Sequence, residues 1–337
     1  MSVDNACVVD LNQGRLKLDC RRGMTLFAAL RMHKLYLPTG CGARGQCGQC
    51  HVRLLSGEAN PPTENELKLI PEPELKAGKR LGCQLRLSGD IAVEAPEHLF
   101  HAREYKATIH SITPLTYDIR RFSFALEPGE TVPHRAGQFL NLSVKIPEAK
   151  AQVIRCFSFA TPSSVVDSVD AIIRMNPKGV MTPYLFNTAK EGDAITLYAP
   201  FGEFTLRPGT APCIWIAGGS GLSPFLGMLQ DMFDSGAERP VHLFFGAVKP
   251  KDLYYVDMFH QMAMRYKWFR FTPALSGDER CPECVDYGLI TDVVSRHVKD
   301  ASGAEGYLCG SPGMIGACIK VLTERGMPAD KIFFDRF

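Results

Sequence analysis

Four cysteines have a spacing that could bind a metal cluster. Cys41, Cys47 and Cys50 stand in one glycine-rich stretch, and Cys83 follows 33 residues after Cys50. Plant-type [2Fe–2S] proteins use C-x4-C-x2-C…C, so the first loop of this C-x5-C-x2-C pattern is one residue longer. Glycines between the thiols let the backbone turn its N–H groups toward the sulfur atoms. Zinc and ordinary thiols are the alternatives. Because zinc sites commonly use two short cysteine pairs, the spacing favours a [2Fe–2S] cluster.

The segments around these cysteines predict a small domain of mixed helices and strands. Apolar and polar residues alternate on both sides of 12–14, which indicates a hairpin. A helix is expected over 25–33, and strands are expected over 49–55 and 91–95. This order of elements around a cysteine loop is typical of the β-grasp fold of ferredoxins.

The middle of the chain has a different pattern. Between residues 103 and 207, short alternating runs are broken by frequent turns, which predicts an antiparallel β-barrel. Two motifs lie inside it, RCFS at 155–158 and GVMT at 179–182. The second opens a helix-like stretch at 181–189, and a helix start after glycine offers free N–H donors to a phosphate. Taken singly, the motifs could be an exposed strand and an ordinary helix cap.

From about residue 211, strand-like and helix-like stretches alternate, which predicts a parallel sheet with helices on both faces. The expected strands, each with the helix that follows it, are 213–217 and 223–233, 241–245 and 253–264, and 307–309 and 314–325. The first strand runs into GGSGLSP at 218–224, where glycines let a pyrophosphate approach the backbone. This stretch lacks the third glycine of the dinucleotide fingerprint and the acidic residue that should follow the second strand.

In this order, the motifs resemble those of NAD(P)H-dependent oxygenase reductases of the ferredoxin-NADP reductase superfamily that carry an N-terminal plant-type ferredoxin. Examples are the reductases of phenol hydroxylase, methane monooxygenase and benzoate dioxygenase. The cysteine spacing and the stretch RLGCQLRLSGDIAVEAPEHLF are also similar to the F subunit of the sodium-translocating NADH:quinone reductase. The resemblance implies a multidomain α+β and α/β chain with three parts. They are a β-grasp [2Fe–2S] ferredoxin domain at 1–98, an antiparallel β-barrel FAD domain at 103–207, and a parallel-sheet α/β NAD(P)H domain at 210–337.

The resemblance assigns flavin contacts to the middle segment. Arg155 would pair with the FAD pyrophosphate, Phe157 would lie against the isoalloxazine, and Ser158 would hydrogen-bond near its reactive nitrogen. Phe157 replaces the usual tyrosine, so stacking remains but a hydroxyl contact is lost. FMN is the alternative, used by a family branch with another domain order. Further flavin contacts are expected at Ile173, Arg174, Gly179, Met181 and Thr182.

The resemblance also assigns a nicotinamide site. Cys309, followed by Gly310 in a CGSP stretch, would lie beside the nicotinamide, where an uncharged sulfur packs without a solvation penalty. The alternative interpretation of Cys309 is a buried cysteine at a strand end. Phe337 would cover the far face of the flavin, with Phe334 as the second choice, although 333–334 are expected in a last strand. The dinucleotide loop would contribute Gly218, Gly219, Gly221, Leu222 and Pro224, the last of which is usual in this family.

The stretch FGAV at 245–248 bears on whether the chain prefers NADH or NADPH. Relatives that prefer NADPH commonly place an arginine after Gly-Ala, where its guanidinium holds the 2′-phosphate. Val248 offers no charge there, although Lys249 and Lys251 follow. We therefore predict that NADH is preferred to NADPH.

These assignments imply one electron path. NADH gives up two electrons as a hydride, FAD accepts the pair and releases electrons singly, and the cluster carries them one at a time to a partner. We expect that partner to be a terminal oxygenase or hydroxylase acting on aromatic or hydrocarbon compounds, or another redox protein. The alternatives are a soluble NADH:ferredoxin or quinone reductase, a reductive activator of another metalloprotein, and a zinc-binding protein with no redox role.

Composition narrows the possible partners. The chain has 337 residues and a net charge of +2, and a nucleic-acid binder would need a larger positive surplus. No stretch reaches the roughly 18 apolar residues of a membrane span, and the first residues lack a secretory pattern. We expect a cytoplasmic monomer. Among the remaining cysteines, Cys281 and Cys284 are interpreted as a chance pair in a surface loop, and small core residues are expected at Cys7, Cys20, Cys156, Cys213 and Cys318.

Overall fold

The computed structural model describes residues 5–146, 149, 152–279 and 285–336. Phe337, Cys281 and Cys284 lie outside these residues, so their expected roles stay predictions. The chain forms two compact units, and its middle segment contributes to both. One unit comprises residues 1–107, 139–157 and 194–201, and the other comprises residues 108–138, 158–193 and 202–337. None of the helices within the described ranges has the length and apolar character needed to cross a bilayer.

The N-terminal segment builds a mixed sheet of five strands in the order β2-β1-β5-β3-β4. The predicted hairpin around 12–14 is confirmed, because β1 and β2 pair antiparallel on either side of it. Thr25 caps α1 by accepting a hydrogen bond from the Ala28 N–H, so the helix begins close to where it was expected. The elements are β1 (Ala6–Leu11), β2 (Leu16–Arg21), α1 (Leu26–Met32), β3 (His51–Ala59), α2 (Glu64–Leu69), α3 (Glu72–Lys76), β4 (Lys79–Leu81), β5 (Leu87–Glu94) and the 3₁₀ turn η2 (Glu97–Phe100).

The middle segment builds a curled antiparallel sheet in the order β10-β7-β6-β11-β8-β9. A bridge between Phe159 and Ala171 brings the chain just after β9 against β10, the opposite edge of the sheet. The sheet thereby curls on itself, in agreement with the predicted barrel. Its elements are β6 (Arg103–Pro114), β7 (Ile119–Leu126), β8 (Phe139–Val144), β9 (Val153–Ser158), β10 (Ser168–Arg174), α4 (Met181–Asn187) and β11 (Ala194–Phe201).

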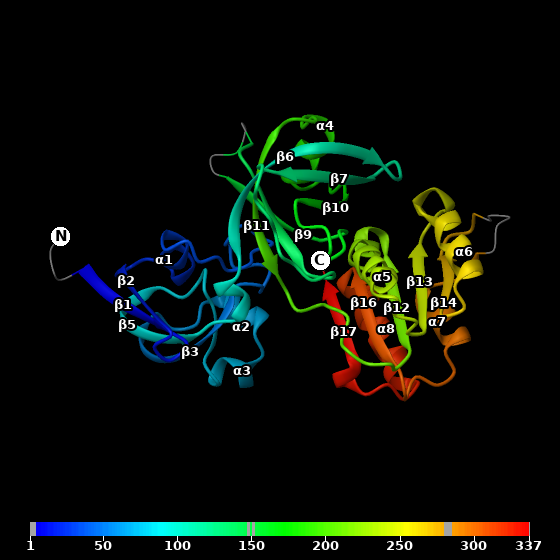
Figure 1. Ribbon diagram of the computed structural model, residues 1–337. Coiled ribbons are helices and arrows are strands. Elements are labelled where there is room, and N and C mark those ends of the chain that lie inside the picture. The colour runs from blue at the N-terminus through cyan, green and yellow to red at the C-terminus, as the bar shows by residue number, and fades with distance from the viewer. Residues whose placement is uncertain (1–4, 147–148, 150–151, 280–284, 337) are drawn as a thin grey trace. The chain divides into compact units, whose positions relative to one another are not determined.

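The C-terminal segment is the predicted parallel α/β sheet, with six strands in the order β15-β14-β13-β12-β16-β17 (Figure 1). Every pairing in it is parallel. The sequence pattern did not identify β14, whose Pro273 is untypical of a central strand. The elements are β12 (Cys213–Gly218), η3 (Gly219–Leu222), α5 (Ser223–Ser235), β13 (Val241–Ala247), η4 (Pro250–Asp252), α6 (Val256–Arg265), β14 (Phe269–Leu275), β15 (Asp286–Tyr287), α7 (Ile290–His297), β16 (Glu305–Gly310), α8 (Pro312–Glu324), η5 (Ala329–Lys331) and β17 (Ile332–Arg336).

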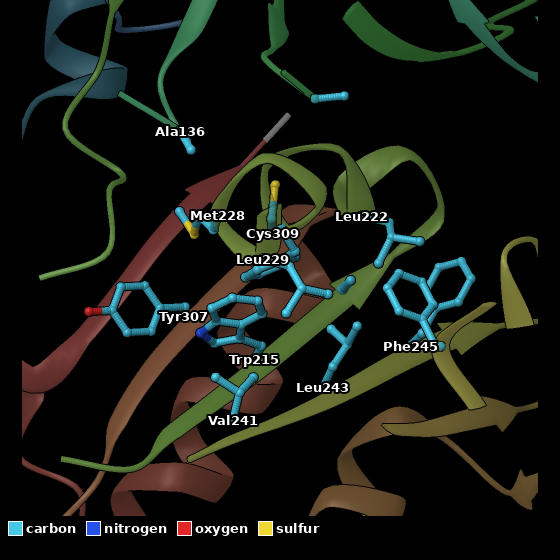
Figure 2. Close-up of a cluster of buried hydrophobic side chains, with 14 of the residues drawn as sticks. Ala136, Trp215, Leu222, Met228, Leu229, Val241, Leu243, Phe245, Tyr307 and Cys309 are labelled. Atoms are coloured by element: carbon cyan, nitrogen blue, oxygen red, sulfur yellow. The ribbon is translucent and has the colours of Figure 1, made fainter. Parts of the chain in front are cut away.

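Alternate residues of β12 face opposite sides of this sheet, because side chains alternate along a strand. Trp215 packs with Leu229 of α5, whereas Ile216 packs with residues of α7 and α8. Figure 2 shows Trp215 among apolar side chains that include Leu229, Leu243 and Tyr307. Both faces are therefore covered, and the carboxyl end of β12, where the glycine loop begins, is held on a rigid core.

Candidate functional site

The four predicted cluster ligands form two thiol pairs. The Cys47 thiol donates a hydrogen bond to Cys41, which lowers the pKa of Cys41 to about 4 and raises that of Cys47. The Cys50 thiol likewise donates to Cys83, lowers the pKa of Cys83 to about 7, and has its own pKa raised. Three of the four are buried and Cys47 is half-buried. Each pair therefore has one sulfur prepared to be a thiolate, the form that binds metal.

The loop between Cys41 and Cys50 winds its backbone around the first of these sulfurs. Its three glycines, Gly42, Gly45 and Gly48, have φ angles of 68°, 73° and 74°. Such left-handed backbone is accessible to glycine at little cost. The N–H groups of Arg44 and Gln46 thereby point at the Cys41 sulfur, at 3.2 and 3.5 Å.

This donor set fits a two-iron cluster. Each iron of a [2Fe–2S] unit needs two thiolates, and the chain presents two pairs of thiols. A single zinc ion would instead gather three or four ligands at one point. We therefore propose Cys41, Cys47, Cys50 and Cys83 as the ligands.

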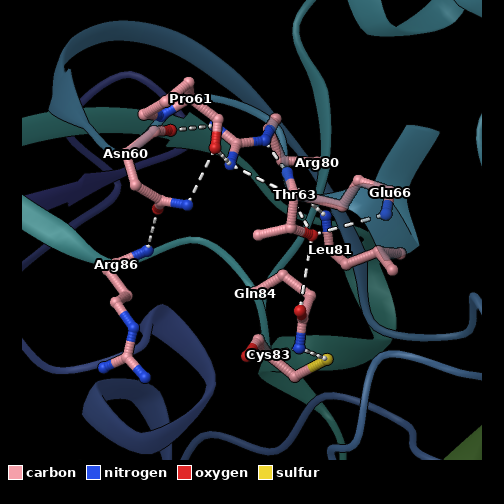
Figure 3. Close-up of polar contacts among 9 residues, drawn as sticks. All are labelled: Asn60, Pro61, Thr63, Glu66, Arg80, Leu81, Cys83, Gln84 and Arg86. Atoms are coloured by element: carbon pink, nitrogen blue, oxygen red, sulfur yellow. Dashed lines mark hydrogen bonds and ion pairs between the residues drawn. The ribbon is translucent and has the colours of Figure 1, made fainter.

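The fourth ligand stands on a segment that is tied to α2 by a buried ion pair. Glu66 is fully buried and accepts from Arg80 Nε at 2.9 Å and from the Leu81 N–H at 2.8 Å (Figure 3). Burial alone would raise the pKa of Glu66, but the hydrogen bonds from Arg80 and the backbone hold it below its usual value. Because breaking such a pair leaves a buried charge uncompensated, this contact fixes the turn that carries Cys83.

The cluster loop also contacts the strand that carries the first flavin motif. Gln49 Nε2 donates to the Cys156 sulfur at 3.3 Å, and a Cβ on Gly40 would lie 3.0 Å from the same sulfur. Cys156 was expected to be a small core residue; it is half-buried, packs against a buried cluster that includes Phe139 and Tyr198, and also contacts this loop through Gln49. The contact brings the predicted cluster ligands beside the RCFS motif, which sequence spacing of more than 100 residues could not indicate.

Arg155 of that motif lies beside the cluster loop. Its guanidinium would be 3.7 Å from a Cβ on Gly42, and its Nη1 donates to the Ile154 carbonyl at 2.7 Å. Burial and the charge of Arg44 lower the pKa of Arg155. Two neighbouring guanidinium groups favour an anion between them, so these residues fit the predicted pyrophosphate contact. Phe157, which follows in β9, is half-buried.

Ser158, Cys309 and Asp335 come together at the end of the last two strands. Ser158 Oγ donates to Asp335 Oδ2 at 3.3 Å, and Asp335 is the register partner of Cys309 across β16 and β17. Burial raises the pKa of Asp335 to about 6, against the opposing effect of the Ser158 hydrogen bond. Burial, followed by the charge of Asp335, raises the pKa of Cys309 well above its usual value, which keeps the sulfur uncharged.

Asp335 is a functional candidate that the sequence pattern missed. A signal existed, because an acidic residue in the last strand, two positions before Phe337, breaks an otherwise aromatic stretch. Part of the residue is exposed, but its carboxylate is enclosed by protein, and this enclosure decides its acidity. The backbone of Ser158 is fixed as well, since its carbonyl accepts from Ser223 Oγ at 2.9 Å.

The GVMT motif is held by hydrogen bonds that its own Thr182 makes. Thr182 Oγ1 accepts from the Asn176 N–H at 2.9 Å and donates to the Asn176 carbonyl at 3.2 Å. Gly179 packs on this turn, and Met181, which opens α4, is buried. The hydroxyl of Thr182 is thus used within the turn, so any contact of the motif with a phosphate would come from the backbone.

Two neighbouring residues of β10 have different surroundings, since one is in the core and the other is at the candidate site. Ile173 is fully buried and pairs with Arg120 of β7. Arg174 is ion-paired with Asp118 at 2.7 Å, and its Nη1 would lie 3.2 Å from a Cβ on Gly219. The Arg174 side chain therefore reaches the dinucleotide loop, and the expected contact of Arg174 with the flavin stays a prediction.

The dinucleotide loop lies directly on the CGSP stretch. A Cβ on Gly221 would stand 2.2 Å from the Cys309 carbonyl oxygen, and one on Gly218 would stand 2.6 Å from the Met314 sulfur. Gly219 has a φ of 56°, and its carbonyl accepts from the Tyr254 hydroxyl at 2.8 Å. Leu222 and Pro224 are buried beneath the loop, and Gly310 follows Cys309 at the end of β16. Only residues without a side chain allow this close approach.

Gly221→Ala is expected to weaken NADH binding. The added methyl collides with backbone atoms of Cys309, so the loop must move away from β16 at a cost of about 1–3 kcal/mol. We expect the KM for NADH to rise about tenfold in steady-state assays. Gly316→Ala is the control, because a Cβ there meets no atom within 4 Å. Equal KM values for the two variants would contradict the assignment of this loop.

Three family models match consecutive parts of the chain. They describe a 2Fe-2S iron-sulfur cluster binding domain at residues 9–88, an oxidoreductase FAD-binding domain at 106–206 and an oxidoreductase NAD-binding domain at 215–320. FAD, a [2Fe–2S] cluster and NADH are thus the cofactors of this protein, as predicted.

Similar proteins cover almost the whole chain. The reductase component of phenol 2-monooxygenase from Pseudomonas sp. (strain CF600) is 31% identical over 329 residues, which are 95% of this chain and 91% of that protein. The F subunit of the Na(+)-translocating NADH-quinone reductase from Idiomarina loihiensis is 30% identical, over 95% of this chain and 88% of that protein. The crystal structure of an Amycolatopsis cytochrome P450 reductase is 30% identical, with a TM-score of 0.82 over 98% of both chains.

The four cysteines, the flavin motifs and the glycine loop thus occur in the same order as the three matched domains. The chain belongs to the NAD(P)H-dependent reductases of the ferredoxin-NADP reductase superfamily that carry a [2Fe–2S] ferredoxin domain, a family that includes the reductase components of phenol and propane monooxygenases.

Proposed function

We propose that this reductase delivers electrons from NADH to an oxygenase component that hydroxylates an aromatic or hydrocarbon compound. The observation that carries the proposal is the contact between Gln49 of the cluster loop and Cys156 of the flavin motif. One chain thereby places the residues expected to hold both redox groups side by side. The relatives that support this acceptor are the reductase components of phenol 2-monooxygenase, propane 2-monooxygenase and xylene/toluene monooxygenase.

The chain's own residues would bind the cofactors, orient them, and hold or release a proton. FAD, when bound, takes an electron pair from NADH and releases single electrons, which the [2Fe–2S] cluster passes on. Arg155 would hold the pyrophosphate with its guanidinium, and the stacked Phe157 would exclude water from the flavin ring. Asp335, with a pKa of about 6, holds a proton or releases it near neutral pH, and the Ser158 hydroxyl is hydrogen-bonded to it. The neutral sulfur of Cys309 offers an apolar contact surface to the nicotinamide.

Reduction of a quinone is the second candidate function. The F subunit of the Na(+)-translocating NADH-quinone reductase matches 95% of this chain, so the sequence relation to that group is as extensive as the relation to monooxygenase reductases.

Purified holoprotein tests the two candidates directly. NADH consumption is measured with a phenol- or alkane-type oxygenase component, with a short-chain quinone, and with cytochrome c as a general one-electron acceptor. Hydroxylated product that forms only when the reductase and the oxygenase component are combined supports the proposal. Quinone reduction that exceeds every protein acceptor would favour the second function, and a colourless protein without iron would refute both.

We propose NADH as the preferred coenzyme. Gly277 donates to the Val248 carbonyl at 2.9 Å, so the loops after β13 and β14 meet at Val248, the position expected to carry an arginine in relatives that prefer NADPH. Lys249 is ion-paired with Glu279 at 2.9 Å, and Lys251 lies over the Tyr117 ring. Both lysines therefore have other partners, and the Glu279 carboxylate would repel a phosphate.

Val248→Arg is expected to raise NADPH use. The new guanidinium would pair with the 2′-phosphate, and kcat/KM for NADPH relative to NADH should rise roughly tenfold. Combination with Glu279→Gln should add to the effect by removing the opposing charge. Lys251→Met is the control and should leave the ratio near that of the unaltered protein. A larger kcat/KM for NADPH in the unaltered protein would overturn the proposed preference.

We further propose that the reductase is a cytoplasmic monomer. NADH is its electron donor, and thiol ligands need a reducing compartment. Sedimentation velocity of the holoprotein should give a single species near the chain mass of 37.2 kDa. Cell fractionation should recover the NADH-dependent activity with the cytoplasmic proteins.

A further inference from the structure

Gln84 follows the fourth cluster cysteine and contacts it with the nitrogen end of its amide. Nε2 lies 3.6 Å from the Cys83 sulfur and 3.2 Å from the Cys83 carbonyl oxygen. At the other end, Oε1 accepts from the Thr63 hydroxyl at 3.4 Å (Figure 3). The side chain therefore bridges a cluster ligand and Thr63, the N-cap residue of α2.

The orientation of this amide is determined by its neighbours. Both atoms that face Nε2 are acceptors, and an amide nitrogen has two protons to give them. A reversed amide would direct its oxygen at a carbonyl oxygen and at a sulfur that is a thiolate when it binds iron. The amide therefore directs its N–H groups at Cys83.

The buried ion pair leaves the Thr63 proton available for Gln84. A hydroxyl has one proton, and Glu66 Oε2, at 3.1 Å, also lies within reach of it. The carboxylate of Glu66 already accepts from both Nε and Nη2 of Arg80 and from two backbone N–H groups. Its charge is therefore compensated, so donation from Thr63 to Gln84 leaves no acceptor of Glu66 unsatisfied.

The cluster loop holds the amide from its other side. A Cβ on Gly45 would lie 2.8 Å from Cδ and Nε2 of Gln84, so the loop packs closely on the amide. The backbone N–H of Gly45 also donates to the Cys83 sulfur. Besides the thiol of Cys50, itself a proposed ligand, the sulfur of Cys83 thus receives a backbone donor from Gly45 and a side-chain donor from Gln84, and the Gln84 donor can be changed by mutation.

We propose that the Gln84 amide raises the reduction potential of the cluster through its N–H donation to the Cys83 sulfur, and that Thr63 positions this amide. The inference rests on the proposed ligand set. Reduction adds negative charge that spreads onto the ligand sulfurs, so a hydrogen-bond donor stabilises the reduced form more than the oxidised form. Gln84 is a tuning residue that acts through Cys83.

Two variants of Gln84 distinguish the effect of its hydrogen-bond donation from the effect of its packing. Gln84→Met keeps the length of the side chain without a donor, and Gln84→Glu keeps its shape but directs a negative charge at the sulfur. We expect both midpoint potentials to fall, with glutamate lower than methionine. For methionine, the ratio of reduced to oxidised cluster at a fixed solution potential should fall up to about tenfold, which corresponds to a shift of about 59 mV. A purely structural role predicts the reverse order, because glutamate matches glutamine in shape.

The measurement is a redox titration of the holoprotein, followed through the electron paramagnetic resonance signal of the reduced cluster. Thr63→Val removes the hydroxyl that orients the amide and should lower the potential by less than Gln84→Met does. Thr63→Ser should restore it. Glu64→Gln is the control for a lost charge on the same helix, because Glu64 is exposed, and it should leave the potential unchanged.

Unchanged potentials in Gln84→Met and Gln84→Glu would overturn the inference, as would glutamate giving the smaller shift. If a Gln84 variant fails to retain iron, equal potentials for Thr63→Val and Thr63→Ser overturn it instead. Iron and sulfide analysis of the unaltered protein separates this failure from failure of the ligand assignment. A protein without two irons and two sulfides removes the cluster site itself.

Discussion

Replacing Cys83 by alanine is expected to abolish electron delivery to one-electron protein acceptors. A [2Fe–2S] cluster needs four thiolates, and loss of one leaves an iron incompletely bound. We expect the NADH-dependent rate of cytochrome c reduction to fall at least about a hundredfold, because electrons then have no carrier beyond the flavin. Reduction of a dye that takes electrons directly from the flavin should continue near the unaltered rate.

Cys318→Ala is the matched control for this substitution. Cys318 is fully buried in α8, on the face of the C-terminal sheet covered by α7 and α8, and belongs to neither thiol pair. Its loss should cost some stability but leave the ratio of cytochrome c to dye reduction unchanged. If Cys83→Ala keeps cytochrome c activity while its iron content falls, the electrons do not leave through the cluster and the proposed path is wrong.

Asp335→Asn is expected to slow NADH oxidation and to change its pH dependence. Asp335 is the titratable partner of Ser158, and its pKa of about 6 lies near physiological pH. Asparagine accepts the same hydrogen bond but cannot gain or lose the proton. We expect kcat with the dye acceptor to fall about 10²-fold, a usual loss for a group that assists proton transfer. The unaltered enzyme should show a limb with an apparent pKa near 6 that the variant lacks.

The same substitution is expected to stabilise the protein above pH 6. An aspartate in an unfolded chain ionises near pH 4, whereas folded Asp335 ionises near pH 6. As pH rises between these values, the unfolded chain loses its proton first. The folded state therefore loses roughly 3 kcal/mol, a loss that is complete above pH 6 and absent below pH 4.

Thermal denaturation of the unaltered protein and of Asp335→Asn checks the sign of this stability difference. Asp335→Asn should have the higher apparent Tm at about pH 7.5 and the same Tm at about pH 4. Asp330→Asn, in the exposed turn before β17, should match the unaltered protein in both Tm and pH profile. A variant that is less stable at about pH 7.5, with an unchanged pH limb, would show that Asp335 has neither role.

The sequence by itself determined which kinds of chemistry the chain carries. The spacing of Cys41, Cys47 and Cys50 indicated an iron–sulfur cluster because those ligands stand on one short loop. The order of the motifs indicated the three domain types, since each motif sits at a turn or strand end whose geometry depends on local residues. Local periodicity likewise identified the hairpin around 12–14 and the strand–helix alternation after residue 211.

Tertiary structure decided which distant residues act together. Asp335 meets Ser158 because two strands far apart in sequence end at the same place, and Cys156, which packs against a buried cluster, also contacts Gln49 of the cluster loop. The amide of Gln84 depends on Thr63, the N-cap of α2, and α2 is held by a buried ion pair. These contacts join residues between 14 and 177 positions apart. Motif spacing records the geometry within one loop, whereas packing brings the separate loops and strands together.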